Sequence, residues 1–329
     1  MIPLVSVIVC THNPRLDYLT RVLGALRAQS LPVTCWELLL MDNGSEEPLQ
    51  GRFDVAWHPR ARLVRVEQRG KVNALLRGLD EFRGEIVVIV DDDNVLGESY
   101  LEKALAISQA WPMIGVWSGS ITAEFEEVPP VWAGPYLRYL AIREVKQDQW
   151  SNLSGPEHFG FLPWGAGMCV RRVVAVEWGR KVRAQQSTRK FERLGSGCGC
   201  EDTDTALTAC DMGLGTGLFA SLRLTHLIRA ERVREPYLLK LLEGQVYSSN
   251  VLGAARGRRP MPPSWPRLIW GHVVALRRGS REFRFYRASL RGARAAAKEV
   301  ATWSGQDDPS NRLIPLRPVG PSSSGPVLL

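Results

Sequence analysis

The sequence predicts an α/β fold with a mostly parallel central sheet, helices on both faces of that sheet and a basic helical extension. Two observations support this prediction. Apolar strand-like runs alternate with amphipathic segments through the first 120 of the 329 residues, and the runs are apolar almost throughout, as strands are when both faces are buried. Polar clusters also follow three of these runs, where parallel strands place ligands.

The expected elements follow one another in the order of repeated strand–helix–strand units. Strands are expected at residues 5–10, 36–41, 63–66 and 86–90, and helices at residues 16–29 and 72–82. Since parallel strands need long crossover connections, which are usually helical, this order favours a Rossmann-like sheet.

The second half has a mixed pattern that several prolines interrupt. A glycine-rich stretch, Gly195-Ser196-Gly197-Cys198-Gly199-Cys200, precedes an expected helix at residues 203–212. We expect this half to form the other side of a cleft that opens at the strand ends.

The composition is that of a globular protein. Hydrophobic residues make up 45% and charged residues 23% of the chain, which excludes disorder of the whole chain. The six cysteines are scattered, so we interpret them as free thiols in a reducing compartment. No secretory signal and no apolar stretch of about 20 residues is visible. The expected location is the cytoplasm, with the inner face of the membrane as the alternative.

Positive charge is concentrated near the C-terminus. Residues 251–303 hold twelve Arg or Lys and two Glu, a formal charge of +10, whereas the whole chain carries +8. Residues 267–278 have the pattern of a basic amphipathic helix. Two alternatives follow, which are peripheral contact with an anionic membrane and packing of the apolar stripe on the rest of the protein. No nucleic-acid partner is expected, because no recognition motif accompanies the charge.

The acidic triplet Asp91-Asp92-Asp93 follows an apolar run, so three carboxylates are expected at the mouth of a buried strand. Their mutual repulsion is costly without a compensating cation. Oxygen ligands favour Mg²⁺ or Mn²⁺, and a divalent ion that also binds a diphosphate supplies the charge. The alternative for an isolated triplet is a solvated acidic turn.

The order and spacing of four motifs resemble those of glycosyltransferase family 2, whose members have the GT-A fold. The motifs are Val7-Ile8-Val9-Cys10-Thr11-His12-Asn13-Pro14, Met41-Asp42-Asn43-Gly44-Ser45, Arg69-Gly70-Lys71-Val72-Asn73-Ala74 and Ile89-Val90-Asp91-Asp92-Asp93-Asn94. The resemblance spans roughly residues 4–250 and implies a metal-dependent, inverting transfer of a sugar from a nucleoside diphosphate sugar to an acceptor hydroxyl.

On the donor side, the resemblance implies that Thr11 and Asn13 line the nucleotide pocket. It implies that Asp42 accepts a hydrogen bond from the base, which favours a UDP-sugar because a carboxylate selects a ring N–H. The alternative for Asp42 is an ordinary Asx turn. Lys71 and Asn73, at the start of a helix, are expected to meet phosphate or ribose. The alternative for this segment is a set of solvated polar side chains.

For the metal, the resemblance implies that Asp93 is a direct ligand and that Asp91 lies nearer the ribose or sugar, where it is a further candidate ligand. Asp92 is the least defined of the three. Related enzymes often carry a histidine at the place of His226, where it reaches the metal or the diphosphate. A structural role is the alternative for this lone histidine.

On the acceptor side, Asp202 and Glu201 resemble the Glu-Asp motif of the family, in which the aspartate is the catalytic base. Glu201 then orients the base or binds the acceptor. Trp164 and Gly165 resemble the acceptor segment, where an aromatic ring stacks on a pyranose. The alternatives are an acidic first turn of a helix for Glu201 and Asp202, and a core position for Trp164.

The expected division of the chain follows from these motifs. It comprises a glycosyltransferase domain at residues 1–250, with a nucleotide-binding half at 1–120 and an acceptor-binding half at 121–250, then the basic helical extension at 251–303 and a disordered tail at 304–329. A linker is expected at residues 255–266 and a loop that orders over the donor near residues 180–200.

The expected acceptor is a carbohydrate or a lipid-linked sugar, as in polysaccharide or glycoconjugate synthesis. Two competing functions are a sugar-nucleotide pyrophosphorylase and a nucleotide-sugar-binding protein without catalysis. A pyrophosphorylase is disfavoured because the first strand precedes Thr11-His12-Asn13-Pro14 rather than a glycine-rich phosphate loop. The presence of both acidic motifs disfavours a non-catalytic protein.

Overall fold

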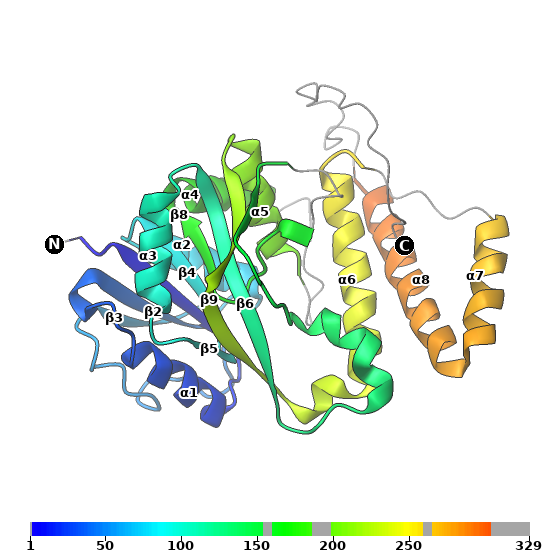
Figure 1. Ribbon diagram of the computed structural model, residues 1–329, viewed down its shortest axis with the longest axis horizontal. Coiled ribbons are helices and arrows are strands. Elements are labelled where there is room, and N and C mark those ends of the chain that lie inside the picture. The colour runs from blue at the N-terminus through cyan, green and yellow to red at the C-terminus, as the bar shows by residue number, and fades with distance from the viewer. Residues whose placement is uncertain (1, 154–159, 186–198, 259–264, 304–329) are drawn as a thin grey trace.

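The computed structural model describes residues 2–153, 160–185, 199–258 and 265–303, and the strands of these residues form one central sheet (Figure 1). The strands are β1 (Val5–Thr11), β2 (Trp36–Asp42), β3 (Ala61–Arg65), β4 (Ile86–Asp91), β5 (Asn94–Leu96), β6 (Ile114–Phe125), β7 (Gln149–Ser151), β8 (Met168–Arg171) and β9 (Gly215–Ile228). The strands and helices expected in the first 120 residues all form, and their ends lie close to the expected ones.

The strands lie in the order β3-β2-β1-β4-β8-β6-β9-β5, and β7 pairs with β9. The first four strands of this order are parallel to one another. Strand β8 is antiparallel to both β4 and β6, and β6 is parallel to β9. The prediction of an α/β fold with a largely parallel sheet is confirmed. The direction of the short strand β8 was not predictable, because four residues carry no periodicity that encodes direction.

Helices cover both faces of the sheet (Figure 1). They are α1 (Leu16–Arg27), α2 (Lys71–Glu81), α3 (Tyr100–Ala110), α4 (Arg172–Gln185), α5 (Glu201–Asp211) and α6 (Glu235–Ala255), with short 3-10 helices η1 (Val33–Cys35), η2 (Val131–Leu140) and η4 (Ala230–Val233).

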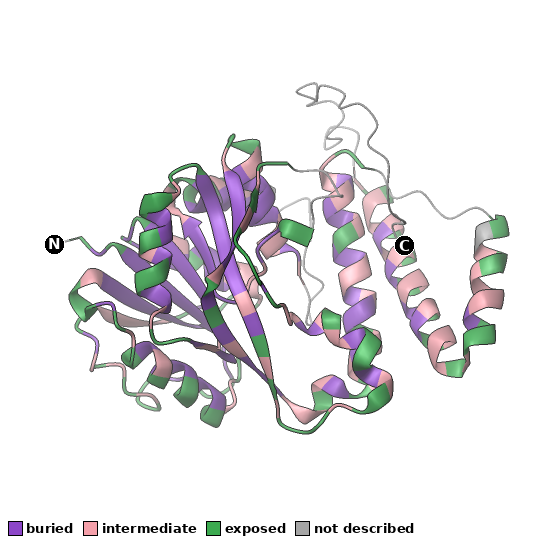
Figure 2. Ribbon diagram, viewed as in Figure 1, coloured by how far each residue is buried: buried purple, intermediate pink, exposed green. Residues whose placement is uncertain are grey.

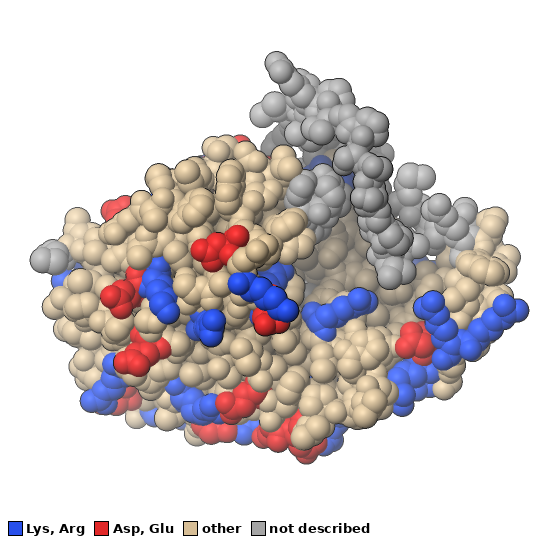
Figure 3. All heavy atoms as spheres, viewed as in Figure 1, with Lys and Arg blue, Asp and Glu red and all other residues tan. Residues whose placement is uncertain are grey.

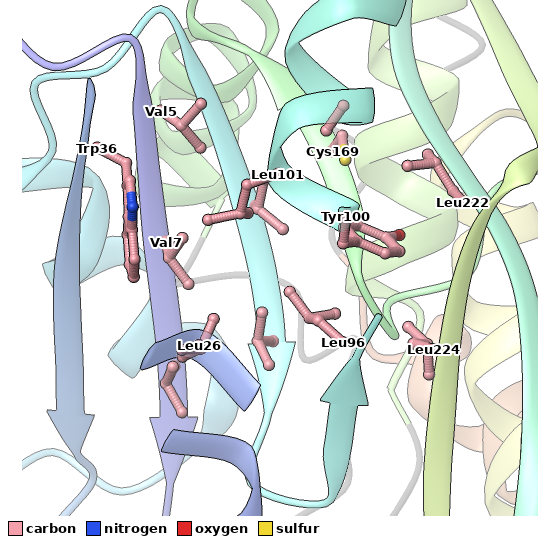
Figure 4. Packing of buried hydrophobic residues seen from close by; sticks show 14 of the residues in the cluster. Val5, Val7, Leu26, Trp36, Leu96, Tyr100, Leu101, Cys169, Leu222 and Leu224 are labelled. Atoms are coloured by element: carbon pink, nitrogen blue, oxygen red, sulfur yellow. The ribbon is translucent and has the colours of Figure 1, made fainter. Parts of the chain in front are cut away.

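Alternate side chains of β1 enter two separate cores, because successive strand residues point to opposite faces. Val5, Val7 and Val9 pack with side chains of α1 and α3. Figure 4 shows Val7 beside Leu26 and Trp36 on this face. Ile8 and Cys10 pack instead with α2, α4 and α5. Figure 2 shows the resulting buried strands between partly exposed helices. This rigid centre fixes the carboxyl ends of β1, β2 and β4.

The extension consists of α7 (Trp265–Arg278) and α8 (Ser280–Ala301), which follow α6 and form a helical hairpin (Figure 1). Helix α8 packs closely along α6, since a Cβ atom on Gly292 would collide with the carbonyl oxygen of Glu243. The rings of Phe285 and Tyr136 stack with centroids 3.7 Å apart. The part of the extension that packs on the rest of the protein is therefore α8.

The expected boundaries of the C-terminal segments differ from the structure or lie outside the described residues. The expected boundary at residue 250 falls inside α6, which ends at Ala255. Within the expected linker, residues 259–264 lie outside the described residues, as does the expected tail at 304–329. Among the helices that the structure describes, none is long and apolar enough to cross a bilayer.

Candidate active site

Polar side chains converge where β1, β2 and β4 end. Thr11 is in register with Asp42, and Cys10 is in register with Asp91. These ends border a cavity of about 1140 Å³, whose other wall comes from α5, η2 and α6. The volume is sufficient for a nucleotide sugar, since typical ligand pockets have about 300 to 1,000 Å³. The expected convergence of the three strand ends is therefore present.

The three carboxylates of the triplet have different partners. Asp91 Oδ1 lies 2.7 Å from Lys71 Nζ, and Asp92 Oδ2 accepts a hydrogen bond of 2.5 Å from Thr11 Oγ1. Asp93 Oδ2 lies 3.0 Å from Arg232 Nη1. In this structure the charges of Asp91 and Asp93 are thus compensated by side-chain cations. The charge of the triplet alone does not require a metal ion, which corrects the electrostatic argument made from the sequence.

His226 is brought to Asp93 by the pairing of β5 with β9. Asn94 is opposite His226 in this antiparallel pair, and the amide of Leu227 donates to the carbonyl oxygen of Asp93 at 2.8 Å. His226 Nε2 consequently lies 3.5 Å from Asp93 Oδ2. The buried His226 Nδ1 has no hydrogen-bond partner among the described residues. The orientation of the ring is therefore set by packing and by the contacts of Nε2.

This pair of side chains fits a metal ion if one other side chain moves. Two ligands at about 2.1 Å from one ion lie no more than about 4.2 Å apart, and 3.5 Å satisfies this limit. Arg232 Nη1 lies 3.0 Å from both His226 Nε2 and Asp93 Oδ2. Its guanidinium group therefore lies where a metal ion held by these two side chains would lie. Within the described residues, no three His, Cys, Asp or Glu side chains form a ready metal cluster.

Asp202 lies in the first turn of α5 and lines the same cavity. Its Oδ2 accepts a hydrogen bond of 3.0 Å from the amide of Gly165, and its Oδ1 accepts one of 2.6 Å from the amide of Thr203. These bonds orient the carboxylate. Burial, together with the negative charge of Glu201, raises the pKa of Asp202 to about 6.

The pH dependence of transfer is expected to follow this carboxyl. A general base must be deprotonated, so kcat/KM for the acceptor should fall about tenfold for each pH unit below about 6 and level off above it. A pH–rate profile of kcat/KM measures this. A profile that stays flat from about pH 5 to about pH 8 would rule out Asp202 as the base.

Lys71 lies between the two acidic motifs that line the cavity. Its Nζ lies 2.7 Å from Asp91 and 3.3 Å from Glu201 Oε1. Burial alone would lower the pKa of Lys71, but the carboxylates of Asp91 and Glu201 raise it well above its ordinary value. The lysine is therefore a permanent cation between the two acidic motifs.

Trp164 both lines the cavity and packs against the core. The guanidinium of Arg143 lies over its ring, 3.6 Å from the centroid. Burial lowers the pKa of Arg143 to about 10, so this cation persists at neutral pH. One face of the indole is thus covered, and stacking of a sugar on Trp164 stays a prediction that requires the other face or a shift of Arg143.

Gly165 provides space beside the carboxylate. A Cβ atom at this position would lie 3.5 Å from Asp202 Cβ and 3.7 Å from Lys71 Nζ, which is ordinary contact. We therefore expect Gly165→Ala to fold normally and to lower kcat/KM for the acceptor about tenfold to a hundredfold, since a methyl group displaces the attacking hydroxyl. Steady-state kinetics with varied acceptor measure the effect.

The matched control is Gly134→Ala in η2, because no atom lies within 4 Å of a Cβ built there. This variant should keep the wild-type kcat/KM. Equal kinetics for Gly165→Ala and Gly134→Ala would contradict an approach of the acceptor past Gly165.

Three residues predicted for the nucleotide pocket do not line the cavity. Asp42 is 2% exposed, and its oxygens accept hydrogen bonds from the amides of Ser45 and Leu49 and from Arg65. It therefore organises the loop after β2. Its contact with a base stays a prediction, because the base would have to replace one of these hydrogen-bond partners.

The other two are Asn13 and Asn73. The Asn13 side chain accepts a hydrogen bond from the amide of Glu46 at 2.8 Å and so joins the loops after β1 and β2. The Asn73 side chain donates to the carbonyl oxygen of Arg69 at 2.8 Å. Their predicted roles at the donor stay predictions.

Sequence reasoning missed the wall formed by η2 and α6. Arg138, Tyr139, Tyr237 and Gln245 line the cavity, yet no motif surrounds them. No sequence signal marked them, because the mixed pattern of the second half predicted no helix at the positions of η2 and α6. Of the predicted loop near residues 180–200, residues 186–198 lie outside the described residues.

Comparison with known proteins identifies similar sequences and folds. The model of glycosyl transferase family 2 matches residues 6–170. A glycosyltransferase of Haloferax volcanii, AglE, is 28% identical over 108 residues, which is 32% of this chain and 35% of AglE. An uncharacterized protein of Sinorhizobium fredii, y4gI, is 32% identical over 114 residues, which is 33% of this chain and 12% of y4gI. The chain thus matches about a third or less of the length of these relatives.

Two solved structures are similar over most of the chain. The mannosyltransferase PcManGT of Pyrobaculum calidifontis, solved in complex with GDP-Man and Mn²⁺, is 19% identical with a TM-score of 0.52, covering 93% of this chain and 78% of PcManGT. TarS 1-349 of S. aureus is 13% identical with a TM-score of 0.47, covering 91% of this chain and 90% of the TarS 1-349 chain.

Proposed function

This chain belongs to glycosyl transferase family 2 and has the GT-A fold, and from this premise we propose that it is a metal-dependent, inverting glycosyltransferase of the hexosyltransferase type. The donor is a nucleoside diphosphate sugar. The acceptor is a hydroxyl of a carbohydrate or of a lipid-linked sugar, as polysaccharide or glycoconjugate synthesis requires. One observation carries the proposal, namely that the acidic motifs at residues 91–93 and 201–202 line one cavity and that Lys71 contacts both.

The proposed base is Asp202, which lies outside the stretch that the family model matches. Its raised pKa, about 6, suits a base that works near neutral pH. Asp202 takes the proton of the acceptor hydroxyl as that oxygen bonds to the anomeric carbon, while the bond to the nucleoside diphosphate breaks on the opposite face. Displacement from the opposite face gives inversion. Gly165 holds Asp202 through its amide, and Glu201 contributes by raising the pKa of the base.

The proposed donor contacts are at the ends of β1 and β4. Thr11, Lys71, Asp91 and Asp92 line the cavity. Lys71 is permanently charged, so it is suited to a phosphate oxygen or to the developing negative charge of the leaving group. A UDP-sugar is the favoured donor, as the resemblance implies. Because PcManGT was solved with GDP-Man, GDP-sugars are the first donors to compare with UDP-sugars.

The proposed cofactor is Mn²⁺ or Mg²⁺, held by Asp93 and His226, with Asp91 as a further ligand. When bound, the ion supplies Lewis-acid stabilisation of the leaving diphosphate. Arg232 must first release Asp93 and His226, because its Nη1 is within 3.0 Å of both. A guanidinium released in this way is a bidentate partner for the diphosphate. The structure of PcManGT with Mn²⁺ supports the presence of a metal.

The expected location stays the cytoplasm. Of the cysteines that the structure describes, Cys10, Cys35, Cys169 and Cys210 are free thiols, which supports a reducing compartment. Cys10 in β1 and Cys169 in β8 are buried in the central sheet.

The proposal is tested in two steps. Thermal-shift measurements with UDP-, GDP- and dTDP-sugars, with and without Mn²⁺, identify the donor, because a ligand that binds only the folded state raises the melting temperature. Product analysis with that donor follows. Release of the nucleoside diphosphate and an inverted anomeric configuration are expected. Pyrophosphate as product would indicate a pyrophosphorylase, and tight binding without hydrolysis or transfer would indicate a binding protein.

A further inference from the structure

Helix α7 presents an apolar stripe to the outside of the protein. Trp265, Ile269, Trp270 and Leu276 are 79%, 62%, 65% and 57% exposed. Trp265, Ile269 and Leu276 are four and seven positions apart, so they lie on one side of the helix. Figure 1 shows α7 at the end of the molecule, on the far side of α8 from α6.

The orientation of this stripe is fixed by the opposite side of α7, which packs on α8. Ala275 is buried, and the ring of His272 contacts the rings of Phe283 and Tyr286. The space beside Gly271 is filled by the hydroxyl group of Tyr286. The side of α7 that packs on α8 is therefore a different side from the one that carries the exposed apolar stripe.

The helical hairpin that carries the stripe is positively charged. Residues 265–303 contain nine Arg or Lys and two Glu, a formal charge of +7. Arg281, Arg284 and Arg291 form ion pairs with Glu235 or Glu243 of α6. Arg277 and Arg278, at the end of α7, are exposed. Figure 3 shows Lys and Arg gathered over this end of the molecule.

We propose that the outer face of α7 docks the protein on an anionic lipid bilayer. The stripe enters the headgroup region, where tryptophan is favoured, and Arg277 and Arg278 contact lipid phosphates. A second copy of the chain is a poor occupant because two faces of this charge repel. A nucleic acid would leave the stripe unused. The contact is peripheral, since none of the described helices is suited to span a bilayer.

The test is flotation of the full chain with vesicles, in the absence of any nucleotide sugar. We expect binding to an equal mixture of phosphatidylglycerol and phosphatidylcholine and little binding to phosphatidylcholine alone. Binding should fall when salt is raised from about 0.1 M to about 1 M, which shortens the Debye length from about 10 Å to about 3 Å. Ile269→Ser with Trp270→Ser should weaken binding at least about tenfold, and Arg277→Gln or Arg278→Gln about fivefold each.

The matched control is Val128→Ser with Val131→Ser, because these valines are 91% and 97% exposed and lie outside α7. This variant should bind as the wild type does. Equal binding of the Ile269/Trp270 variant, equal binding to neutral vesicles or no binding would overturn the proposal. Self-association that is lost in the same variant would assign the face to a second copy instead.

A parallel assay of sugar transfer to a water-soluble acceptor keeps this proposal separate from the proposed function. All α7 variants should retain wild-type transfer in that assay, because none of their substituted residues lines the cavity. Loss of flotation with normal transfer supports docking through α7. Absence of transfer in the wild type contradicts the proposed function without affecting the vesicle result.

Discussion

Asp202→Asn is expected to lower kcat about a hundredfold to ten-thousandfold, the usual contribution of a positioned general base. Asparagine keeps the size of the side chain, and its oxygen can still accept the hydrogen bond of 3.0 Å from Gly165, although its NH2 group cannot accept the bond from Thr203. It cannot accept the proton of the acceptor hydroxyl. Single-turnover measurements with saturating donor separate this loss in chemistry from any change in binding.

Unfolding of the same variant tests whether a folding defect causes the loss of kcat. The pKa of Asp202 is raised from its ordinary value of 3.8 to about 6, so the folded state binds this proton more tightly than the unfolded state. The stabilisation is complete below about 3.8 and is lost as the pH rises through about 6. Above that pH, Asp202→Asn should be more stable than the wild type by about 1 to 2 kcal/mol in urea unfolding.

The matched control for Asp202→Asn is Asp211→Asn, which makes the same change at the other end of α5. Asp211 forms ion pairs with Lys181 and Arg256 and does not line the cavity. It should retain kcat within about twofold while losing up to about 1 kcal/mol of stability. Near-normal turnover of Asp202→Asn would remove this residue from the mechanism.

Asp93→Asn is expected to lower kcat about a thousandfold or more, because a Lewis acid at the leaving group contributes several kcal/mol to the transition state. Chelation with EDTA should abolish transfer by the wild type, and Mn²⁺ should restore it. Electron paramagnetic resonance of free Mn²⁺ measures binding directly. The affinity of Asp93→Asn should be at least about tenfold weaker than that of the wild type.

Asp92→Asn is the control for this second prediction. It makes the same change one residue earlier, where the carboxylate accepts a hydrogen bond from Thr11 and its pKa is raised to about 6 by burial and by Asp93. Binding of Mn²⁺ should change little in this variant. Full transfer in EDTA would exclude the metal, whereas unchanged Mn²⁺ affinity of Asp93→Asn would exclude only this ligand.

The sequence predicted the first 120 residues of the fold well, because this half depends on local patterns. Five or more apolar residues followed by a polar cluster are visible without any tertiary information, and the register of β1 with β2 and β4 then brings the clusters together. The proximity of His226 to Asp93 was suggested by resemblance and not by pattern. It depends on the pairing of β5 with β9, and β5 has only three residues.

The remaining parts of the site depend on contacts that sequence periodicity does not contain. The link from Lys71 to Glu201 requires the relative placement of α2 and α5. The engagement of Asp42 by backbone amides depends on the conformation of the following loop. The position of Arg232 between Asp93 and His226 depends on the placement of η4 beside the ends of β4 and β9.

The pairing of β5 with β9 also determines when the site can form during synthesis. Asp93 leaves the ribosome well before its partners His226 and Arg232, which lie more than a hundred residues later in the sequence. Contacts between such distant segments form slowly, because a long loop must close first. A nascent chain can therefore assemble the parallel strands β1 to β4 early, but it completes its acidic pocket only after β9 and η4 have emerged.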